Sequence, residues 1–474
     1  MLRIDRFLKH GLAVLGLAGM VGVLALSIGC GGGGSSTSPF TTSASSAVQV
    51  RMGDDPDDRV VAFEITVNSV VLTNQSGATV SVLASPTTLE LTHLADTNGP
   101  LSFLNIKQDT YTQAAITVSN PEIAYINSLG QVVEKQLSLT TTVTVNFSPA
   151  LVVGPGTSVV NLDLDLAHTL TINLATGSIS VNPVFVVTTS AVPPEGQEDQ
   201  ENEDDGQLQG IWGIVSAETA NSFTITVGLS QQSLTFAVDS NTNFEDISGT
   251  SQMKTGMLVR VNAVTQPTGV LLAKRVVAVE MDNASEADGM ITAVSGSPAT
   301  QFSLLDQDGV GMGLTDKMLG ATLNVGVTSN TVFSIPEDVD LSNLLFTPVF
   351  DAASLRAGQR VEADTNLGVT PMAGGAILSA SHVELRKQAV HGVVANYAST
   401  GSGQFTFTLD LPAESYLTLL SQGTITSITV VQQPSTELRN LNAVANGANI
   451  RVRGVLFWTG SGYTMVASRI VAIQ

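Results

Sequence analysis

The chain has 474 residues and carries 20 Lys or Arg against 41 Asp or Glu, a formal net charge of −21 at pH 7. Hydrophobic residues make up 43% of it, enough to bury several cores, which excludes a wholly disordered chain. The acidic excess argues against nucleic acid as a partner, because phosphate binding needs a Lys and Arg surface. The single cysteine excludes an intramolecular disulfide framework and a Cys-based zinc site.

The N-terminus has the three parts of an export signal: a basic start, an apolar run over residues 11–26, and Cys30 after a small residue. The end of this segment resembles the bacterial lipobox, with Ser27 where a leucine is usual. The resemblance implies that residues 1–29 are a lipoprotein signal peptide and that Cys30 is lipidated. An uncleaved membrane anchor is the alternative, because the run is nearly long enough to span a bilayer.

Residues 30–46 are rich in Gly and Ser, which predicts a flexible tether between the lipid and the folded body. The expected location is therefore the bacterial cell envelope, with the membrane as a partner through the anchor at Cys30. Gly31 after the cysteine, rather than Asp, favours the outer membrane by analogy with other lipoproteins.

Residues 47–190 show short runs of alternating apolar and polar residues between turn residues, which predicts an antiparallel, Ig-like β-sandwich. In one such run Leu162, Leu164 and Leu166 are expected to face the core. The domain resembles the bacterial family catalogued as domain of unknown function 4382. The motifs that carry this resemblance are Val48-Gln-Val-Arg-Met-Gly-Asp-Asp-Pro-Asp-Asp, Val67-Asn-Ser-Val-Val-Leu, Leu89-Glu-Leu-Thr-His-Leu, Gln108-Asp-Thr-Tyr-Thr-Gln, Leu162-Asp-Leu-Asp-Leu and Asn182-Pro-Val-Phe.

Residues 191–208 follow as an acidic linker, because seven acidic residues without a basic one repel each other and cannot pack.

Beyond the linker, five features recur three times in one order: a glycine-led strand, an aromatic strand, a polar turn before an apolar residue, a second glycine-led strand, and a closing strand that begins at an alanine. The five features begin at Gly213, Phe223, Asn241 (Asn-Thr-Asn-Phe), Gly256 and Ala273 in the first copy, at Gly289, Phe302, Asn330 (Asn-Thr-Val-Phe), Gly358 and Ala380 in the second, and at Gly392, Phe405, Ser435 (Ser-Thr-Glu-Leu), Gly447 and Ala467 in the third.

The repeats predict three small, closed, OB-like β-barrels at 209–282, 286–386 (with insertions) and 389–474, so the whole fold is expected to be all-β. We expect the closing strand of each barrel to pair with its opening strand. Residues 413–420 predict a short helix. The three units resemble domain of unknown function 5666, found in tandem on exported bacterial proteins; like the first family, it brings no assigned activity.

Four carboxylates, Asp54, Asp55, Asp57 and Asp58, surround Pro56. They predict either a Ca²⁺ site, in which a cation offsets their mutual repulsion, or a solvated turn with Asp side chains on backbone N–H groups. No other cofactor is expected. A metal site built from His382, His391 and Glu384 is disfavoured, because the two histidines belong to different repeats.

The second candidate site is a ligand patch of Arg451, Arg453, Phe457 and Tyr463 in the third repeat. Alternation along 450–458 places the arginines and Phe457 on one face, unless a bulge at Gly454 resets the register. The alternative is that this face packs on the neighbouring repeat.

No hydrolase motif, metalloprotease helix or phosphate-binding loop is present in the sequence. The expected function is therefore a non-enzymatic, surface-exposed binding, scaffold or adhesion module whose partner is an envelope glycan or protein. The alternative is an envelope hydrolase acting on polysaccharide or peptide, which predicts an inter-domain cleft lined by carboxylates with raised pKa values.

Overall fold

The computed structural model describes residues 44–473 except 56, 95–97, 193–206, 228–231, 246, 280–284, 312–321, 337–338, 366–368, 370–376 and 402. The predicted signal peptide with Cys30, most of the tether and most of the acidic linker lie outside these residues. The fold is all-β, as predicted, with two short α-helices, α1 (Leu166–Thr169) and α2 (Tyr416–Leu420). None of the helices described could cross a lipid bilayer.

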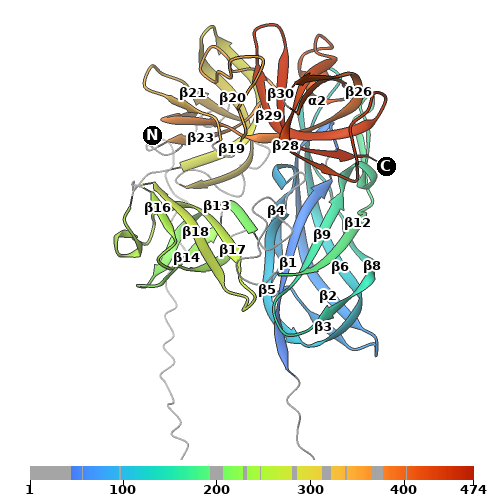
Figure 1. The fold of residues 1–474 in the computed structure, drawn as a ribbon. Coiled ribbons are helices and arrows are strands. Elements are labelled where there is room, and N and C mark those ends of the chain that lie inside the picture. Colours follow the sequence, from blue (N-terminus) through green and yellow to red (C-terminus); the bar gives the residue numbers. More distant parts are fainter. Residues whose placement is uncertain are drawn as a thin grey trace, which may run out of the picture. The chain divides into compact units, whose positions relative to one another are not determined.

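The N-terminal domain is a sandwich of two sheets (Figure 1). The first has the order β12-β9-β1-β5, with β1 (Ser45–Asp55), β5 (Asn98–Lys107), β9 (Ser158–Asp165) and β12 (Phe185–Ala191). The second has the order β3-β2-β6-β7, with β4 on β2 and β8 on β6: β2 (Val60–Asn74), β3 (Thr79–Ser81), β4 (Thr87–Glu90), β6 (Asp109–Ile126), β7 (Val132–Gln136) and β8 (Thr140–Val153).

Alternating side chains from both sheets fill the sandwich core. Leu162, Leu164 and Leu166 are fully buried there, as their spacing predicts, together with Phe63 and Ile65 of β2. One pairing departs from the predicted antiparallel arrangement, because β1 and β9 run parallel. A hairpin of β10 (Leu170–Asn173) and β11 (Ser178–Val181) and the 3-10 turn η1 (Thr92–Leu94) complete the domain.

The third repeat is a closed barrel with the order β26-β27-β28-β30-β29. Its strands are β26 (Lys387–Gly401), β27 (Gln404–Asp410), β28 (Ser427–Arg439), β29 (Asn449–Trp458) and β30 (Tyr463–Ala472). The expected pairing between closing and opening strands is wrong: β30 closes the ring by running parallel to β28, and the opening strand β26 pairs with β27 and β29. The predicted helix in the third repeat is α2.

The first repeat forms the same circuit in the order β15-β14-β13-β17-β18, closed by a parallel β15–β18 pairing, with β16 also on β18. Its elements are β13 (Gln207–Glu218), β14 (Ser222–Val227), β15 (Ser233–Ala237), β16 (Asn243–Glu245), η3 (Thr250–Gln252), β17 (Leu258–Thr265) and β18 (Leu271–Val279).

In the second repeat the strand that corresponds to β18 is divided into β24 (Ile377–Ser379) and β25 (His382–Leu385), which pair with β21 and β23. The remaining strands are β19 (Ser285–Gly296), β20 (Ala299–Gly311), β21 (Thr322–Gly326), β22 (Val332–Ser334) and β23 (Arg360–Thr365).

The same backbone contact explains the second glycine of every repeat. Gly256, Gly358 and Gly447 all have positive φ, between 84° and 93°, where glycine is favoured. Each is held to the opening strand by two reciprocal hydrogen bonds. The Gly358 N–H, for example, donates to the Ile291 carbonyl at 2.7 Å. The Ile291 N–H in turn donates to the carbonyl of the next residue, Gln359, at 2.9 Å.

The repeated threonine and alanine are partners in space. The hydroxyls of Thr242, Thr331 and Thr436 donate to the carbonyls of Ala273, Ala380 and Ala467 at 2.7, 2.8 and 2.8 Å. Two sequence features about 30 to 50 residues apart are therefore one contact that ties the polar turn to the closing strand.

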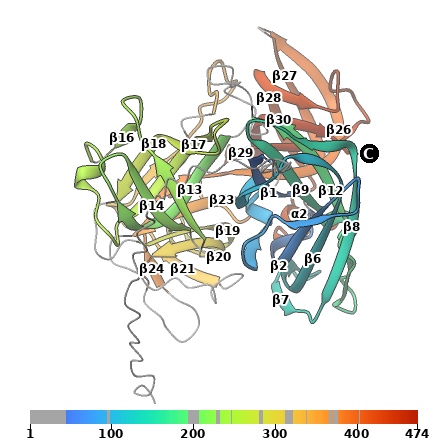
Figure 2. The ribbon, with the colours of Figure 1, turned by 90° about the horizontal axis from the view of Figure 1, so that it is seen from below.

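Side chains also pack across domain boundaries. Val455 and Phe457 of β29 join the apolar cluster of the second barrel. Val61, Ala62, Ala124 and Ile126 of the sandwich join that of the third barrel. In Figures 1 and 2, β13 of the first barrel lies next to β19 and β23 of the second.

Candidate functional site

The strongest concentration of charge among the described residues lies on the outer face of the second barrel. Along β23 and β25 the odd-numbered residues, such as Val361 and Val383, are fully buried in the barrel core. The even-numbered residues therefore point outward, because side chains alternate along a strand. The strand register aligns Glu286 with Asp364, Asp288 with Glu362, Glu362 with Glu384, and Asp364 with His382.

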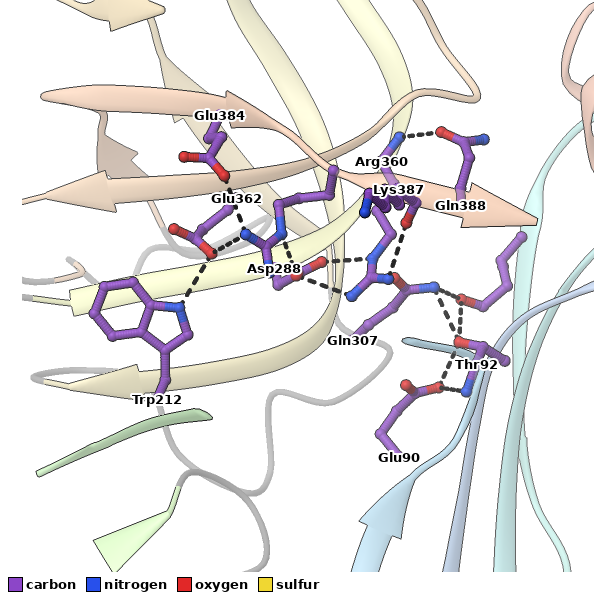
Figure 3. Close-up of polar contacts among 12 residues, drawn as sticks. Glu90, Thr92, Trp212, Asp288, Gln307, Arg360, Glu362, Glu384, Lys387 and Gln388 are labelled. Carbon is purple, nitrogen blue, oxygen red and sulfur yellow. Dashed lines mark hydrogen bonds and ion pairs between the residues drawn. The ribbon is translucent and has the colours of Figure 1, made fainter. Parts of the chain in front are cut away.

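Two arginines of the same barrel bind these acids, as Figure 3 shows for Arg360. The Arg360 guanidinium donates hydrogen bonds to both carboxylate oxygens of Asp288, at 2.7 and 2.9 Å. Arg386 lies 3.1 Å from Glu384, 3.3 Å from Glu362 and 3.5 Å from Asp288. A guanidinium offers five donors in a planar fork, so it can bind both oxygens of one carboxylate and still contact others.

The first barrel contributes a third arginine and a tryptophan. The indole Nε1 of Trp212, on β13, donates to Glu362 Oε2 at 3.1 Å (Figure 3). Arg260, on β17, lies 3.5 Å from Glu362 and stacks over the Trp212 ring at 5.6 Å. We call Glu286, Asp288, Glu362, Glu384, Arg260, Arg360 and Arg386 the acid–arginine cluster; it joins the first two barrels.

A polar contact also runs from the second barrel to the sandwich. The Gln307 amide donates to the Val61 carbonyl at 2.5 Å and to Thr92 Oγ1 at 3.0 Å. Glu90 in turn accepts from the Thr92 backbone N–H at 3.0 Å (Figure 3). The second barrel therefore has polar contacts with the first barrel and with the sandwich.

Burial changes the proton affinity of the cluster. Glu286 is 1% exposed and Glu362 2%. Burial, reinforced by the charges of Glu362 and Asp308, raises the pKa of Glu286 well above its usual value. Burial raises the pKa of Glu362 to about 7, even though Arg386 and Arg260 oppose that shift. Glu362 therefore holds a proton in mildly acidic solution, and burial favours the protonated form of Glu286 in the same way.

One carboxylate oxygen each from Glu286, Asp288 and Glu362 lie within 4.8 Å of one another, a spacing that could suit a metal ion. The surrounding arginines favour a different interpretation. Asp288 and Glu362 already accept from Arg360 and Arg386, so the positive charge that a cation would supply is provided by the chain. We interpret the cluster as an ion-pair network between barrels.

The raised pKa values predict that the protein becomes less stable as pH rises. A group whose pKa is higher in the folded than in the unfolded state contributes full stability below the unfolded pKa and loses it as pH rises through the folded pKa. Glu286→Gln should therefore flatten the fall in Tm between pH 5 and pH 8, and the variant should melt above the wild type at pH 8. Thermal melts at three pH values measure this.

Two histidines titrate in the same direction in this window. The hydrogen bond to Asp364 raises the pKa of His382. Burial lowers the pKa of His391, but its hydrogen bond to Asp58 and the charge of Asp58 outweigh burial, so that pKa is raised as well. Glu286→Gln should therefore reduce the slope without abolishing it. An unchanged slope would show that Glu286 does not hold a proton in the folded protein.

Three of the four carboxylates around Pro56 have different partners. Asp57 binds the Arg59 side chain and accepts from its backbone N–H at 2.9 Å. Asp58 Oδ2 lies 2.6 Å from His391 Nδ1, in the third barrel. Asp54 is 2% exposed and its charge acts on Arg451. The Asp55 side chain lies outside the described residues. The Ca²⁺ hypothesis stays a prediction.

Two of the four residues of the predicted ligand patch, Phe457 and Tyr463, contact the neighbouring barrel. Phe457 is 1% exposed and meets the Phe346 ring edge-on, with 5.6 Å between centroids. Tyr463 is 7% exposed and donates to the Ala357 carbonyl. Arg451 is 7% exposed, and burial lowers its pKa to about 10; Arg453 is half-buried. These contacts match the alternative, in which the face packs on the neighbouring repeat.

Gly454 does not reset the register of β29. The irregularity lies opposite it, on β30, where Ser468 is the extra residue between Ala467 and Arg469. The predicted alternation along β29 is therefore kept.

The acid–arginine cluster was not predicted from the sequence, although a signal for it exists. Charged residues alternate with apolar ones in Glu286-Ala-Asp, Arg360-Val-Glu-Ala-Asp and His382-Val-Glu-Leu-Arg, all within one repeat. Aligning these strands would have placed the charges on one outer face. The signal from Trp212 and Arg260 is weaker, because they belong to another repeat.

Comparison with known proteins adds one family match. No curated protein matches the chain. One similar solved structure is a copper(II)-bound CusF variant from Escherichia coli, with 18% identity over 18% of this chain and 100% of that chain and a TM-score of 0.13. A second is Drosophila Unr CSD456, with 10% identity over 56% of this chain and 98% of that chain and a TM-score of 0.13. A third is a Streptococcus pneumoniae multidomain protein with nucleic acid binding domains, with 11% identity over 54% of this chain and 72% of that chain and a TM-score of 0.10. TM-scores this low do not indicate a shared overall fold. Residues 213–277, in the first barrel, match the family described as Domain of unknown function (DUF5666).

Proposed function

We propose that the chain is a non-catalytic binding or scaffold module of the bacterial cell envelope, exposed at the surface and anchored in the outer membrane through lipid on Cys30. The observation that supports the proposal is that buried charged side chains form contacts between domains. The acid–arginine cluster and the Asp58–His391 pair connect domains to one another rather than line an open cleft. Such connections hold several β-domains as one body, which suits a scaffold.

The hydrolase alternative predicts carboxylates with raised pKa values between domains, and Glu286 and Glu362 have them. Their side chains are 1% and 2% exposed, however, so a glycosidic or peptide bond has no surface on which to approach them. In our proposal these groups connect barrels and take no part in a reaction.

Two family assignments belong to the same proposal. The shared glycine and threonine contacts support placing the second and third barrels in the family that the first barrel matches. The sandwich motifs support membership of domain of unknown function family 4382 for residues 47–190.

The anchor predicts a specific behaviour in detergent. The full chain, produced in a bacterium with a lipoprotein export pathway, should partition into the detergent phase, and Cys30→Ala should move it to the aqueous phase. If the variant still partitions with detergent, the apolar run itself is the anchor and the lipidation proposal is wrong. Ser27→Leu, which restores the usual lipobox residue, serves as the control and should keep the wild-type behaviour.

The binding role is tested by a screen of envelope glycans and envelope proteins. Residues 43–474, which cluster as one compact unit, are the fragment to use. We expect saturable binding to at least one glycan or protein, and an unrelated protein of similar net charge controls for binding by charge alone. Release of a cleaved product without retained ligand would favour the hydrolase alternative instead.

A further inference from the structure

A serine, a histidine and an aspartate are hydrogen-bonded in series on the second barrel. They lie on the neighbouring strands β22, β25 and β23. Ser334 Oγ is 2.7 Å from His382 Nε2, and His382 Nδ1 is 3.1 Å from Asp364 Oδ2. The histidine therefore uses one ring nitrogen for the hydroxyl and the other for the carboxylate.

This is the arrangement that activates a serine. A nucleophile within hydrogen-bond reach of a base, with the base oriented by a third group, is the structural signature of nucleophilic catalysis. We propose that Ser334 is a nucleophile, with His382 as its general base and Asp364 as the positioning residue, and that the site hydrolyses small carboxylic esters. This proposal replaces the non-catalytic part of the function proposed above and leaves its binding and scaffold part in place. Labelling of Ser334 tests the first, and the binding screen tests the second.

The three side chains are partly exposed, unlike Glu286 and Glu362 of the neighbouring acid–arginine cluster, which are 1% and 2% exposed. The side chains of His382 and Asp364 are 29% and 20% exposed, and Ser334 is half-buried. A small acyl group can therefore reach Ser334 Oγ. The hydrogen bond to Asp364 also raises the pKa of His382, which makes the deprotonated imidazole a stronger base and moves its deprotonation to higher pH.

A second acceptor lies near the serine, because Glu384 Oε2 is 3.4 Å from Ser334 Oγ. The shorter distance to His382 favours the imidazole as the proton acceptor. Glu384 is also held elsewhere: its Oε1 lies 3.1 Å from Arg386 and 3.7 Å from Arg260. Its charge is therefore already compensated.

The reaction needs only the side chains of the site, the ester and one water molecule. Ser334 Oγ forms a bond to the ester carbonyl carbon while His382 Nε2 takes the hydroxyl proton. The bond to the alcohol oxygen then breaks, and His382 returns the proton to the leaving alcohol. A water molecule, deprotonated by His382, attacks the acyl-serine and releases the acid, and the proton goes back to Ser334.

The test is covalent labelling of the full chain in mild detergent with a fluorophosphonate probe, followed by peptide mass spectrometry. We expect one adduct per chain, on Ser334, with fluoride released. The labelling rate should rise with pH as His382 loses its proton, and 4-nitrophenyl acetate should be hydrolysed with the same pH profile.

Three variants complete the test. Ser334→Ala should abolish labelling, and His382→Gln should lower its rate by about 100-fold or more. Ser381→Ala, next to the histidine but outside the series, should label at the wild-type rate. Absence of an adduct on the wild type, or an adduct that persists in Ser334→Ala, would overturn the proposal. If either variant fails to fold, the labelled position in the wild type decides: Ser334 supports it and any other residue overturns it.

Discussion

Replacing Arg386 with methionine is expected to lower the free energy of unfolding by about 3 kcal/mol, since removing one partner of a buried ion pair leaves the other charge uncompensated. Arg386 lies within 3.5 Å of three carboxylates, of which Asp288 is 6% and Glu362 2% exposed. Its own side chain is 23% exposed, which places the effect at the lower end of the range for buried pairs. Urea unfolding at pH 8 measures the loss.

The loss should depend on pH in a defined direction. Arg386 stabilises the ionised form of Glu362, whose pKa is raised to about 7. At pH 5 Glu362 is protonated in the folded protein, so it needs less compensation and the cost of Arg386→Met should be smaller. An equal cost at pH 5 and pH 8 would show that Arg386 acts through packing rather than through charge.

A matched control is available on the first barrel. Arg275 also binds a carboxylate with two hydrogen bonds, at 2.7 Å each, but its side chain is 30% exposed and that of its partner Glu245 36%. Exposed pairs contribute about 0.2–1 kcal/mol. Arg275→Met should therefore cost well under half as much as Arg386→Met.

The repeats were predictable because each barrel satisfies the same local demands. Gly358 is needed where the backbone takes a positive φ, and Thr331 where a hydroxyl reaches the closing strand. Each of these requirements restricts the residue type at a single position, so the same residue recurs in every repeat and can be recognised in one sequence. The all-β class follows from alternation in the same way.

The contacts between domains could not be predicted, because no local rule restricts them. Trp212 and Glu362 are 150 residues apart, and nothing in either strand indicates the other. The parallel β1–β9 pairing and the ring closure through β28 and β30 are likewise properties of the assembled sheets. Phe457 illustrates the consequence for function: its position beside two arginines suggested a ligand patch, yet the second barrel covers it.

Replacing Gly289 with alanine is expected to destabilise the protein by about 3 kcal/mol or more, at the upper end of the cost of overpacking. The opening strand bends closely over its neighbour in every barrel. A Cβ on Gly213, Gly289 or Gly392 would lie 2.7, 1.9 or 2.4 Å from the carbonyl oxygen of Thr226, Leu305 or Asp410. The first glycine of each repeat is therefore needed for close approach of two backbones.

The clash at Gly289 cannot be relieved by a side-chain rotation, because the atom in the way is a backbone oxygen of the paired strand. Gly326, on β21 of the same barrel, is the matched control: a Cβ there would lie 3.9 Å from the Leu378 oxygen, an ordinary contact. Gly326→Ala should change the free energy of unfolding by less than about 1 kcal/mol. If urea unfolding gives the two variants the same stability, the opening strand does not need the glycine, and the repeat motif has another cause.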